Sequence, residues 1–171
     1  MRAGFSEDFM GYKAKFLVAL LAFCLVLAWQ AEAAQLATKK ALTLEVTKGI
    51  AAAAEAHAKE NGWNVVIAIL DDGGNLLYLQ RMDGVQIGSI EVAISKAESA
   101  INFKRSTKVF GDAVGGRTAL VALPGAMPFE GGLPITWGGE VIGSIGVSGV
   151  TAQQDGMIAK AGTMALTKIL K

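Results

Sequence analysis

The sequence predicts an α+β fold in which helices pack on the faces of one antiparallel sheet. Three observations predict it: helical periodicity at both ends of residues 34–171, two pairs of apolar strands joined by glycine-rich turns, and one further helix between the pairs. Because a tight turn closes each strand pair, the sheet needs no parallel crossover connection. Helices that cover such a sheet on its faces form an α+β sandwich.

Residues 1–33 are predicted to be a secretory signal peptide. The basic residues Lys13 and Lys15 precede the apolar run Phe16–Ala28, and small residues at Ala31 and Ala33 predict cleavage after Ala33. The apolar run is short for a membrane span. We therefore expect an exported protein, periplasmic or secreted, whose single domain comprises residues 34–171 and which has no membrane contact after cleavage.

The first residues of this leader are unusual. Glu7 and Asp8 are acidic, whereas leaders of this kind begin with a basic segment. Translation from Met10 would remove both. The true start, Met1 or Met10, stays open at this point.

Composition excludes several classes of function. The formal net charge of the 171-residue chain is +1, which is not the basic footprint of a nucleic-acid binder. The single cysteine, Cys24, lies inside the apolar run of the leader. The mature chain therefore has no disulfide, no thiolate nucleophile and no cysteine metal ligand.

The first half of the domain contains a helix, a hairpin and a second helix. Apolar residues at a spacing of four and three predict the helix Leu42–Glu60. The continuous apolar run Val65–Leu70 predicts a strand buried on both faces, and Leu76–Arg81 returns from a turn rich in aspartate and glycine. The helix from Ile90 to Phe103 follows. Its predicted buried stripe consists of Ile90, Ile94, Ala97 and Ile101.

The second half begins with a long connection. Periodicity is lost from Lys104 to Gly132, apart from a short helix predicted around Thr107–Val114. The strands Leu133–Thr136 and Val141–Ser148 then form the second hairpin, and a helix runs from Ala152 to Leu170. We predict that this helix turns Met157, Ala161, Met164 and Ile169 inward.

The stretch Gly131–Asp155 has unusually small side chains for a strand and its turn. Glycine weakens a strand, so several glycines there predict the close approach of another backbone or of a ligand. Thr151 and Gln154 have the spacing of a capping box, and Asp155 falls in the first helical turn, where a carboxylate suits the helix dipole. The stretch contains no pair of nucleophile and base.

His57 is the only histidine of the chain. Its place on the apolar stripe of the first helix leaves two interpretations: a core or interface histidine with a satisfied hydrogen bond, or an axial haem ligand. One histidine without cysteine does not supply a structural zinc site.

Several other polar residues are candidates for binding. Arg105 and Lys108, near Ser106 and Thr107, are either solvated or anchors for a ligand carboxylate, because arginine matches a carboxylate bidentately. Aspartates in the turns, namely Asp71, Asp72 and Asp83, are expected to bind nearby backbone amides. No phosphate loop and no nucleophile elbow has the required spacing.

Four segments resemble the GlcG/HbpS-like haem-binding family, which is also described as haem-degrading. They are VVIAILDDGGNLLYLQRMDG (Val65–Gly84), SIEVAISKAESAINFKRST (Ser89–Thr107), GGLPITWGGEVIGSIGVSG (Gly131–Gly149) and QQDGMIAKAG (Gln153–Gly162). Together these segments span almost all of residues 34–171, and their combination is specific.

The resemblance implies a profilin-like α/β/α sandwich, assembly into a symmetric homo-oligomer and haem as the cofactor. Carried over by position, it gives Lys96, Arg105 and Thr107 as haem contacts, while His57 is the only nitrogen ligand by chemistry. The chain departs from the family pattern where Asn75 replaces a histidine after the glycine pair. The segment 103–107 also lacks the family's proline.

Two functions from different classes follow. The first is an exported haem- or tetrapyrrole-binding protein with weak haem degradation, in which His57 or Thr107 approaches the iron and Lys96 and Arg105 hold the propionates. The alternative is a non-catalytic oligomeric accessory module that binds a small carboxylate or a partner protein beside a metabolic or redox enzyme. The shortage of acid–base residues favours the alternative.

Overall fold

The computed structural model describes residues 7–28 and 34–171, and the chain divides into two compact units, residues 1–39 and 40–171. In the first unit, α1 (Glu7–Ala28) contains the apolar run of the predicted leader. The cleavage site predicted after Ala33 falls outside the described residues. Within the described part of the chain, no helix has the length and apolar character needed to cross a membrane.

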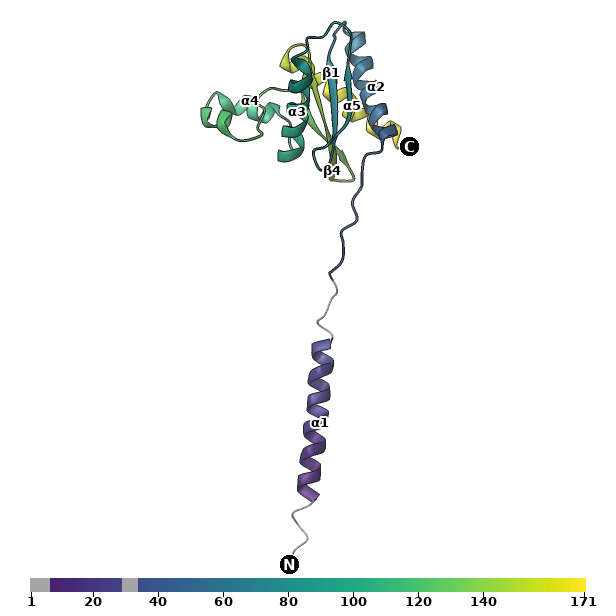
Figure 1. Cartoon of the computed structure of the whole chain (residues 1–171), viewed down its shortest axis with the longest axis vertical. Helices are drawn as coiled ribbons and strands as arrows, with labels where there is room; N and C mark the ends of the chain where they lie inside the picture. Colours follow the sequence, from purple (N-terminus) through teal and green to yellow (C-terminus); the bar gives the residue numbers. More distant parts are fainter. Residues whose placement is uncertain (1–6, 29–33) are drawn as a thin grey trace, which may run out of the picture. The chain divides into compact units, whose positions relative to one another are not determined.

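The second unit is built on one four-stranded antiparallel sheet (Figure 1). Its strands are β1 (Val66–Asp71), β2 (Leu76–Arg81), β3 (Gly132–Trp137) and β4 (Glu140–Ser148), and their order is β2-β1-β4-β3. β1 and β4 are the central pair, and each closes a hairpin with an edge strand. Both predicted hairpins and the antiparallel sheet are confirmed.

Helices cover both faces of this sheet. Figure 1 shows α2 (Leu44–Glu60) and α5 (Ala152–Ile169) on one face and α3 (Ser89–Phe103) on the other. The core between the sheet and the α2–α5 layer is the larger one and includes Ile50, Ile67, Ile145, Val147 and Ile158. The core beneath α3 is smaller and is formed by Val66, Ala68, Leu70, Ala93 and Ala97. The architecture is therefore the predicted α/β/α sandwich.

The connection from α3 to β3, residues 104–131, leaves the sandwich as an excursion that we call the arm. It carries α4 (Lys108–Val114) and a short 3-10 helix, η1 (Thr118–Ala122), and it extends beyond the sheet in Figure 1. The short helix predicted around Thr107–Val114 is thus confirmed. The arm is anchored at its return, where the Met127 amide donates to Ser99 Oγ at 3.0 Å.

The glycines of β3 and β4 allow the backbone of α3 to approach the sheet. A Cβ atom added at Gly146 would overlap the carbonyl oxygen of Ala93, and one added at Gly132 would overlap the carbonyl oxygen of Lys96. Gly132 and Gly146 are partners in the β3–β4 ladder. The close approach predicted from the glycines is therefore that of another backbone, α3.

Two predicted helix faces were only partly right: Ala97 and Ile101 of α3 are buried and Ile169 of α5 packs against the core, as predicted, but other residues are not. In α3, Ile90 and Ile94 are only half-buried, whereas Ala93, Lys96, Ala97 and Ala100 are buried. The reason is the glycine surface of the sheet, against which small side chains fit and isoleucines do not.

In α5, the residues that point inward are Ile158, Ala159, Gly162 and Leu166. Met157 and Met164 are instead 53% and 65% exposed. The close packing of α5 on α2 rotates the helix, because Gly162 lies against the backbone of Ile50.

Two local signals at element ends, at Thr151 and Asp71, are confirmed. Thr151 and Gln154 form the capping box at the start of α5, and the Thr151 hydroxyl accepts from the Gln154 amide at 3.3 Å. Asp71 Oδ1 accepts from the Gly73 and Asn75 amides at 2.9 and 2.8 Å, as expected for a turn aspartate. The Asn75 side chain also donates to Asp71, so it stabilises the turn.

Candidate functional site

Lys96 forms a buried ion pair with Asp155. Its Nζ lies 2.7 Å from Asp155 Oδ2 and donates a second hydrogen bond to the Val147 carbonyl oxygen at 3.0 Å. The two side chains are 2% and 3% exposed. Burial raises the pKa of the Asp155 carboxyl, while the hydrogen bond and the charge of Lys96 act in the opposite direction. The Lys96 ammonium is therefore engaged inside the protein.

The Gly131–Gly132 backbone covers this ion pair. Gly131 has φ = +128°, a conformation that favours glycine, and a Cβ atom there would lie 2.8 Å from Lys96 Nζ. The Gly132 amide donates to Thr107 Oγ1 at 3.0 Å, and the Thr107 amide donates to the Gly132 carbonyl at 3.0 Å. The Thr107 side chain is fully buried. Thr107 thus holds Gly131–Gly132, which we call the GG segment, in place above the Lys96–Asp155 pair.

Arg105 lies outside this buried cluster. Its Nε donates to the Phe103 carbonyl at 3.1 Å, and the residue is exposed between Lys104 and the start of α4. Lys108 pairs with Asp112 at 2.7 Å on the α4 surface. Arg105 therefore presents its charge to solvent at the base of the arm.

A small pocket lies where α4, the end of the arm and the start of α5 meet. Its volume is about 270 Å³, and we call it the corner pocket. Glu130 reaches over the first turn of α5, where a Cβ atom on Gly156 would collide with its carboxylate. The pocket is lined by Lys108, Gly111, Asp112, Pro128, Phe129, Glu130, Ala152 and Gln153.

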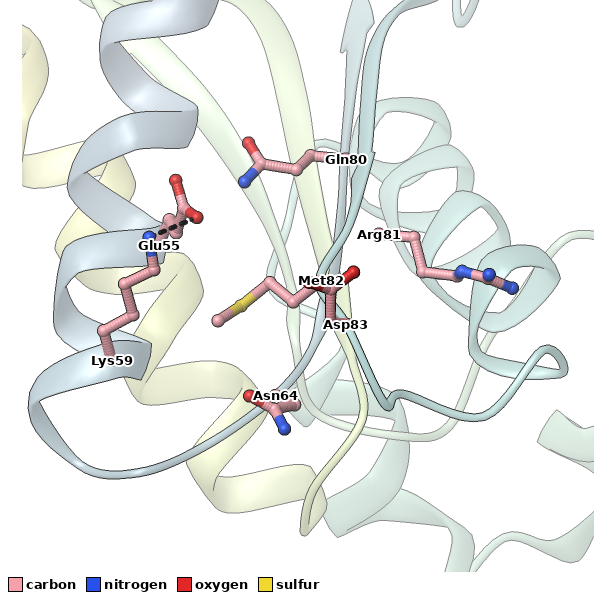
Figure 2. Close-up of a pocket in the computed structure, with 7 residues that line it drawn as sticks. All are labelled: Glu55, Lys59, Asn64, Gln80, Arg81, Met82 and Asp83. Atoms are coloured by element: carbon pink, nitrogen blue, oxygen red, sulfur yellow. Dashed lines mark ion pairs between the residues drawn. The ribbon is translucent and has the colours of Figure 1, made fainter.

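A second and larger pocket, of about 480 Å³, lies between α2 and the edge strand β2 (Figure 2). In Figure 2 the Met82 thioether points into it, whereas Arg81 points away. Glu55 accepts from Lys59 Nζ at 2.8 Å, and hydrogen bonds from Lys59 and then Gln80 lower the pKa of its carboxyl. The hydrogen bond between Glu55 and Gln80 links α2 to β2, and the charges of Glu55 and Lys59 are paired with each other.

A third hollow, of about 600 Å³, lies on the arm, and we call it the arm hollow. Apolar side chains dominate its lining, which a single stretch of chain, residues 116–124, supplies. Arg117 contributes its only charge. Val121 is 62% exposed beside it. The arm hollow therefore combines an apolar surface with one guanidinium.

His57 lies on the other side of the sheet from Lys96 and Thr107. Its ring makes an edge-to-face contact with Trp63, with centroids 6.2 Å apart. Its Nε2 is buried and has no hydrogen-bond partner among the described residues. Because α2 and α3 cover opposite faces of the sheet, His57 does not meet the other three predicted residues in one cavity.

Sequence reasoning missed the role of Asp155 as the partner of Lys96, and it assigned that carboxylate to the helix dipole. A signal was available in α3, where Lys96 lies among small residues: a lysine between Ala93 and Ala97 on a helix face implies burial with a counter-ion. The sequence did not predict the pocket between α2 and β2 or the arm hollow, because no rule of residue spacing identifies the residues that line them.

These features together define a class of small α/β/α domains: the sandwich, the glycine-lined strand β4 and the buried ion pair of Lys96 and Asp155 beneath Gly131–Gly132. The chain belongs to the haem-degrading protein HbpS-like family, whose model matches residues 42–164. GlcG from Escherichia coli K12 is 40% identical over 112 residues, which are 65% of this chain and 84% of that protein.

Two solved structures are also similar. Klebsiella pneumoniae protein ORFY has a TM-score of 0.73 and 32% identity, over 80% of this chain and 98% of that one. The haem complex of PduOC has a TM-score of 0.67 and 28% identity, over 74% of this chain and 95% of that one. These likenesses confirm the predicted family and fold.

The residues expected to hold haem do not fit it as one set within this chain. Lys96 and Thr107 are buried and bonded to protein partners, and His57 lines none of the three hollows described above. We therefore assign no iron ligand and derive no chemistry at iron.

Proposed function

We propose that the protein binds haem or a related tetrapyrrole. The observation that carries this proposal is the likeness to a domain solved as a haem complex, PduOC, of which this chain covers 95%. Membership of a family described as haem-degrading supports it. Binding is proposed for the domain of residues 34–171, after export and removal of residues 1–33.

The arm hollow offers an open apolar surface and one guanidinium, features that suit a tetrapyrrole. At about 600 Å³ it falls within the range of about 300–1,000 Å³ of ligand pockets. Leu120, Leu123 and Pro124 supply apolar contact, and the Arg117 guanidinium matches a carboxylate bidentately. Arg105, at the base of the arm, is a further exposed cation and is not among the residues that line the hollow.

Titration of the purified protein with hemin tests the proposal. We expect a shifted Soret band that saturates, and a dissociation constant raised about tenfold by Arg117→Ala, since a hydrogen bond to a charged group contributes about 1.5–3 kcal/mol. Lys48→Ala, on the exposed face of α2, is the matched control. Absence of a Soret shift would remove the proposal.

Two further variants test the predicted iron ligands. Because the His57 Nε2 and the Thr107 hydroxyl are buried, we expect His57→Ala and Thr107→Ala to leave the Soret maximum of the complex unchanged. A displaced maximum in either variant would restore that side chain as the ligand. Loss of the Soret band on adding ascorbate in air would reveal haem degradation as a separate activity.

The second candidate is an accessory module that binds a small carboxylate. The corner pocket supports it by size alone, because about 270 Å³ is too small to enclose a macrocycle but has room for a small acid. Its one cation, Lys108, is paired with Asp112, so a bound carboxylate would have to displace that partner. Native mass spectrometry of protein purified from its own host separates the two functions, since it reports the mass of the retained ligand.

A further inference from the structure

The side chains that line the arm hollow include no usual ligand of haem iron. Proteins hold that iron with histidine, cysteine, methionine or tyrosine side chains. Residues 116–124 contain none of these, and their polar side chains are Arg117 and Thr118 alone. A guanidinium stays protonated and donates hydrogen bonds only, so it cannot ligate a metal. The described lining of the hollow therefore has no group that recognises the central metal of a macrocycle.

Residues that could ligate iron lie elsewhere in the domain. Met127 follows the hollow in the chain but is not part of its lining, and its amide is bonded to Ser99 of α3. The Tyr78 hydroxyl donates to Gln80 on β2. His57 belongs to α2, on the face of the sheet opposite α3. None of these side chains lines the arm hollow.

The apolar surface of the hollow is formed by the chain's own turns. The Leu120 amide donates to the Arg117 carbonyl at 3.0 Å, the Leu123 amide to the Leu120 carbonyl at 3.2 Å, and the Ala126 amide to the Leu123 carbonyl at 3.1 Å. A flat apolar ring that lies on this surface gains free energy in proportion to the apolar area removed from water. That gain does not depend on the atom at the centre of the ring.

The one charge of the hollow suits the edge of such a ring. Arg117 is exposed, and no ion pair of Arg117 is found in the part of the chain that the structure describes. A guanidinium holds a carboxylate with two parallel hydrogen bonds. The carboxylates of a porphyrin are on its rim, so this contact is also independent of the metal.

We propose that the arm hollow recognises the porphyrin ring and one of its carboxylates and is indifferent to the central metal. Metal-free protoporphyrin IX is then a ligand of the same rank as hemin. This inference rests on the proposed function and defines its ligand class: a flat, apolar macrocycle with an ionised carboxylate on its rim, whether or not it contains iron.

Parallel titrations of the purified protein with hemin and with protoporphyrin IX test the inference, by absorbance and by porphyrin fluorescence. We expect the two dissociation constants to agree within about threefold, since both ligands bury the same apolar area. Arg117→Ala should raise both by about tenfold. Leu123→Glu, which places a carboxylate in the hollow, should weaken both as well. Lys48→Ala, on α2, is the control and should change neither.

The dimethyl ester of protoporphyrin IX isolates the carboxylate contact. It should bind the wild-type protein about tenfold more weakly than the free acid, with no further loss in Arg117→Ala, because the partner of the guanidinium is already absent. An ester that binds as tightly as the acid would overturn the role of Arg117.

The outcomes separate this inference from the proposed function. Binding of hemin without binding of protoporphyrin IX would overturn metal indifference and leave haem binding intact. Binding of neither ligand would remove both. Equal binding of both ligands that Arg117→Ala and Leu123→Glu leave unchanged would overturn the arm hollow as the site, provided that the circular dichroism spectra of the variants match the wild type.

Discussion

Lys96 Nζ lies 2.7 Å from Asp155 Oδ2, and this one contact joins the helical layers on the two faces of the sheet. Lys96 belongs to α3, and Asp155 belongs to the first turn of α5. The Val147 carbonyl, near the end of β4, accepts the second hydrogen bond of the lysine. The pair therefore has a structural role that its residue types alone do not reveal.

Removal of one partner should destabilise the domain strongly. We expect Lys96→Met and Asp155→Leu each to lower the free energy of unfolding by about 3–5 kcal/mol, because each leaves a buried charge uncompensated. The double variant should lose much less than the sum. Urea unfolding measures all three. The exposed pair gives the control: Lys108→Met should leave the urea midpoint unchanged.

The Ser144 hydroxyl is buried and has no hydrogen-bond partner among the described residues. Ser144→Ala should therefore raise the free energy of unfolding by about 1 kcal/mol, since an unsatisfied buried group carries a desolvation cost. Ser148→Ala, four residues along on the same face of β4, should have the opposite effect because it removes a bond to Ser89. Equal destabilisation by both variants would refute the assignment.

Close packing of α3 on the sheet makes Gly146 sensitive to any side chain. Gly146→Ala should destabilise the domain by about 1–3 kcal/mol or more, because the added methyl group meets the backbone at Ala93. Gly116→Ala is the control, since a Cβ atom there has no neighbour within 4 Å. Thermal melts compare the melting temperatures of the two variants. Similar melting temperatures would contradict the close approach of α3 to Gly146.

The Glu55 carboxyl should make stability depend on pH. Hydrogen bonds from Lys59 and Gln80 lower its pKa in the folded state. Its contribution is therefore present above the ordinary value of about 4.3 and is lost as the pH falls through the folded-state pKa. The difference in urea midpoint between wild type and Glu55→Gln should shrink on acidification over that window. Glu60→Gln, also near the end of α2, serves as the control.

The predicted leader should be removed during export. Amino-terminal mapping of the exported protein should find Ala34 as the first residue, and mapping of the precursor distinguishes Met1 from Met10. Ala33→Leu should block processing, because the cleavage site requires a small residue. Thr38→Leu lies beyond the site and should be processed normally. An exported protein that retains residues 16–28 would disprove the signal peptide.

The sequence by itself determined the order of the elements and the antiparallel sheet. Periodicity located α2, α3 and α5, and turn residues such as Asp71 and the Thr151 cap located element ends, because these are interactions between near neighbours in the chain. The four motif segments between Val65 and Gly162 were together enough to predict the family.

Only the tertiary structure decided which helix faces are buried and where the polar residues point. Alanines, rather than Ile90 and Ile94, occupy the centre of the contact between α3 and the sheet, because the opposing strands are lined with glycine. This fit joins segments that lie some fifty residues apart in the chain, as does the hydrogen bond between Lys96 and Val147. His57 and Thr107 likewise fall on opposite sides of the sheet. Distances between such segments depend on packing, which no local spacing rule contains.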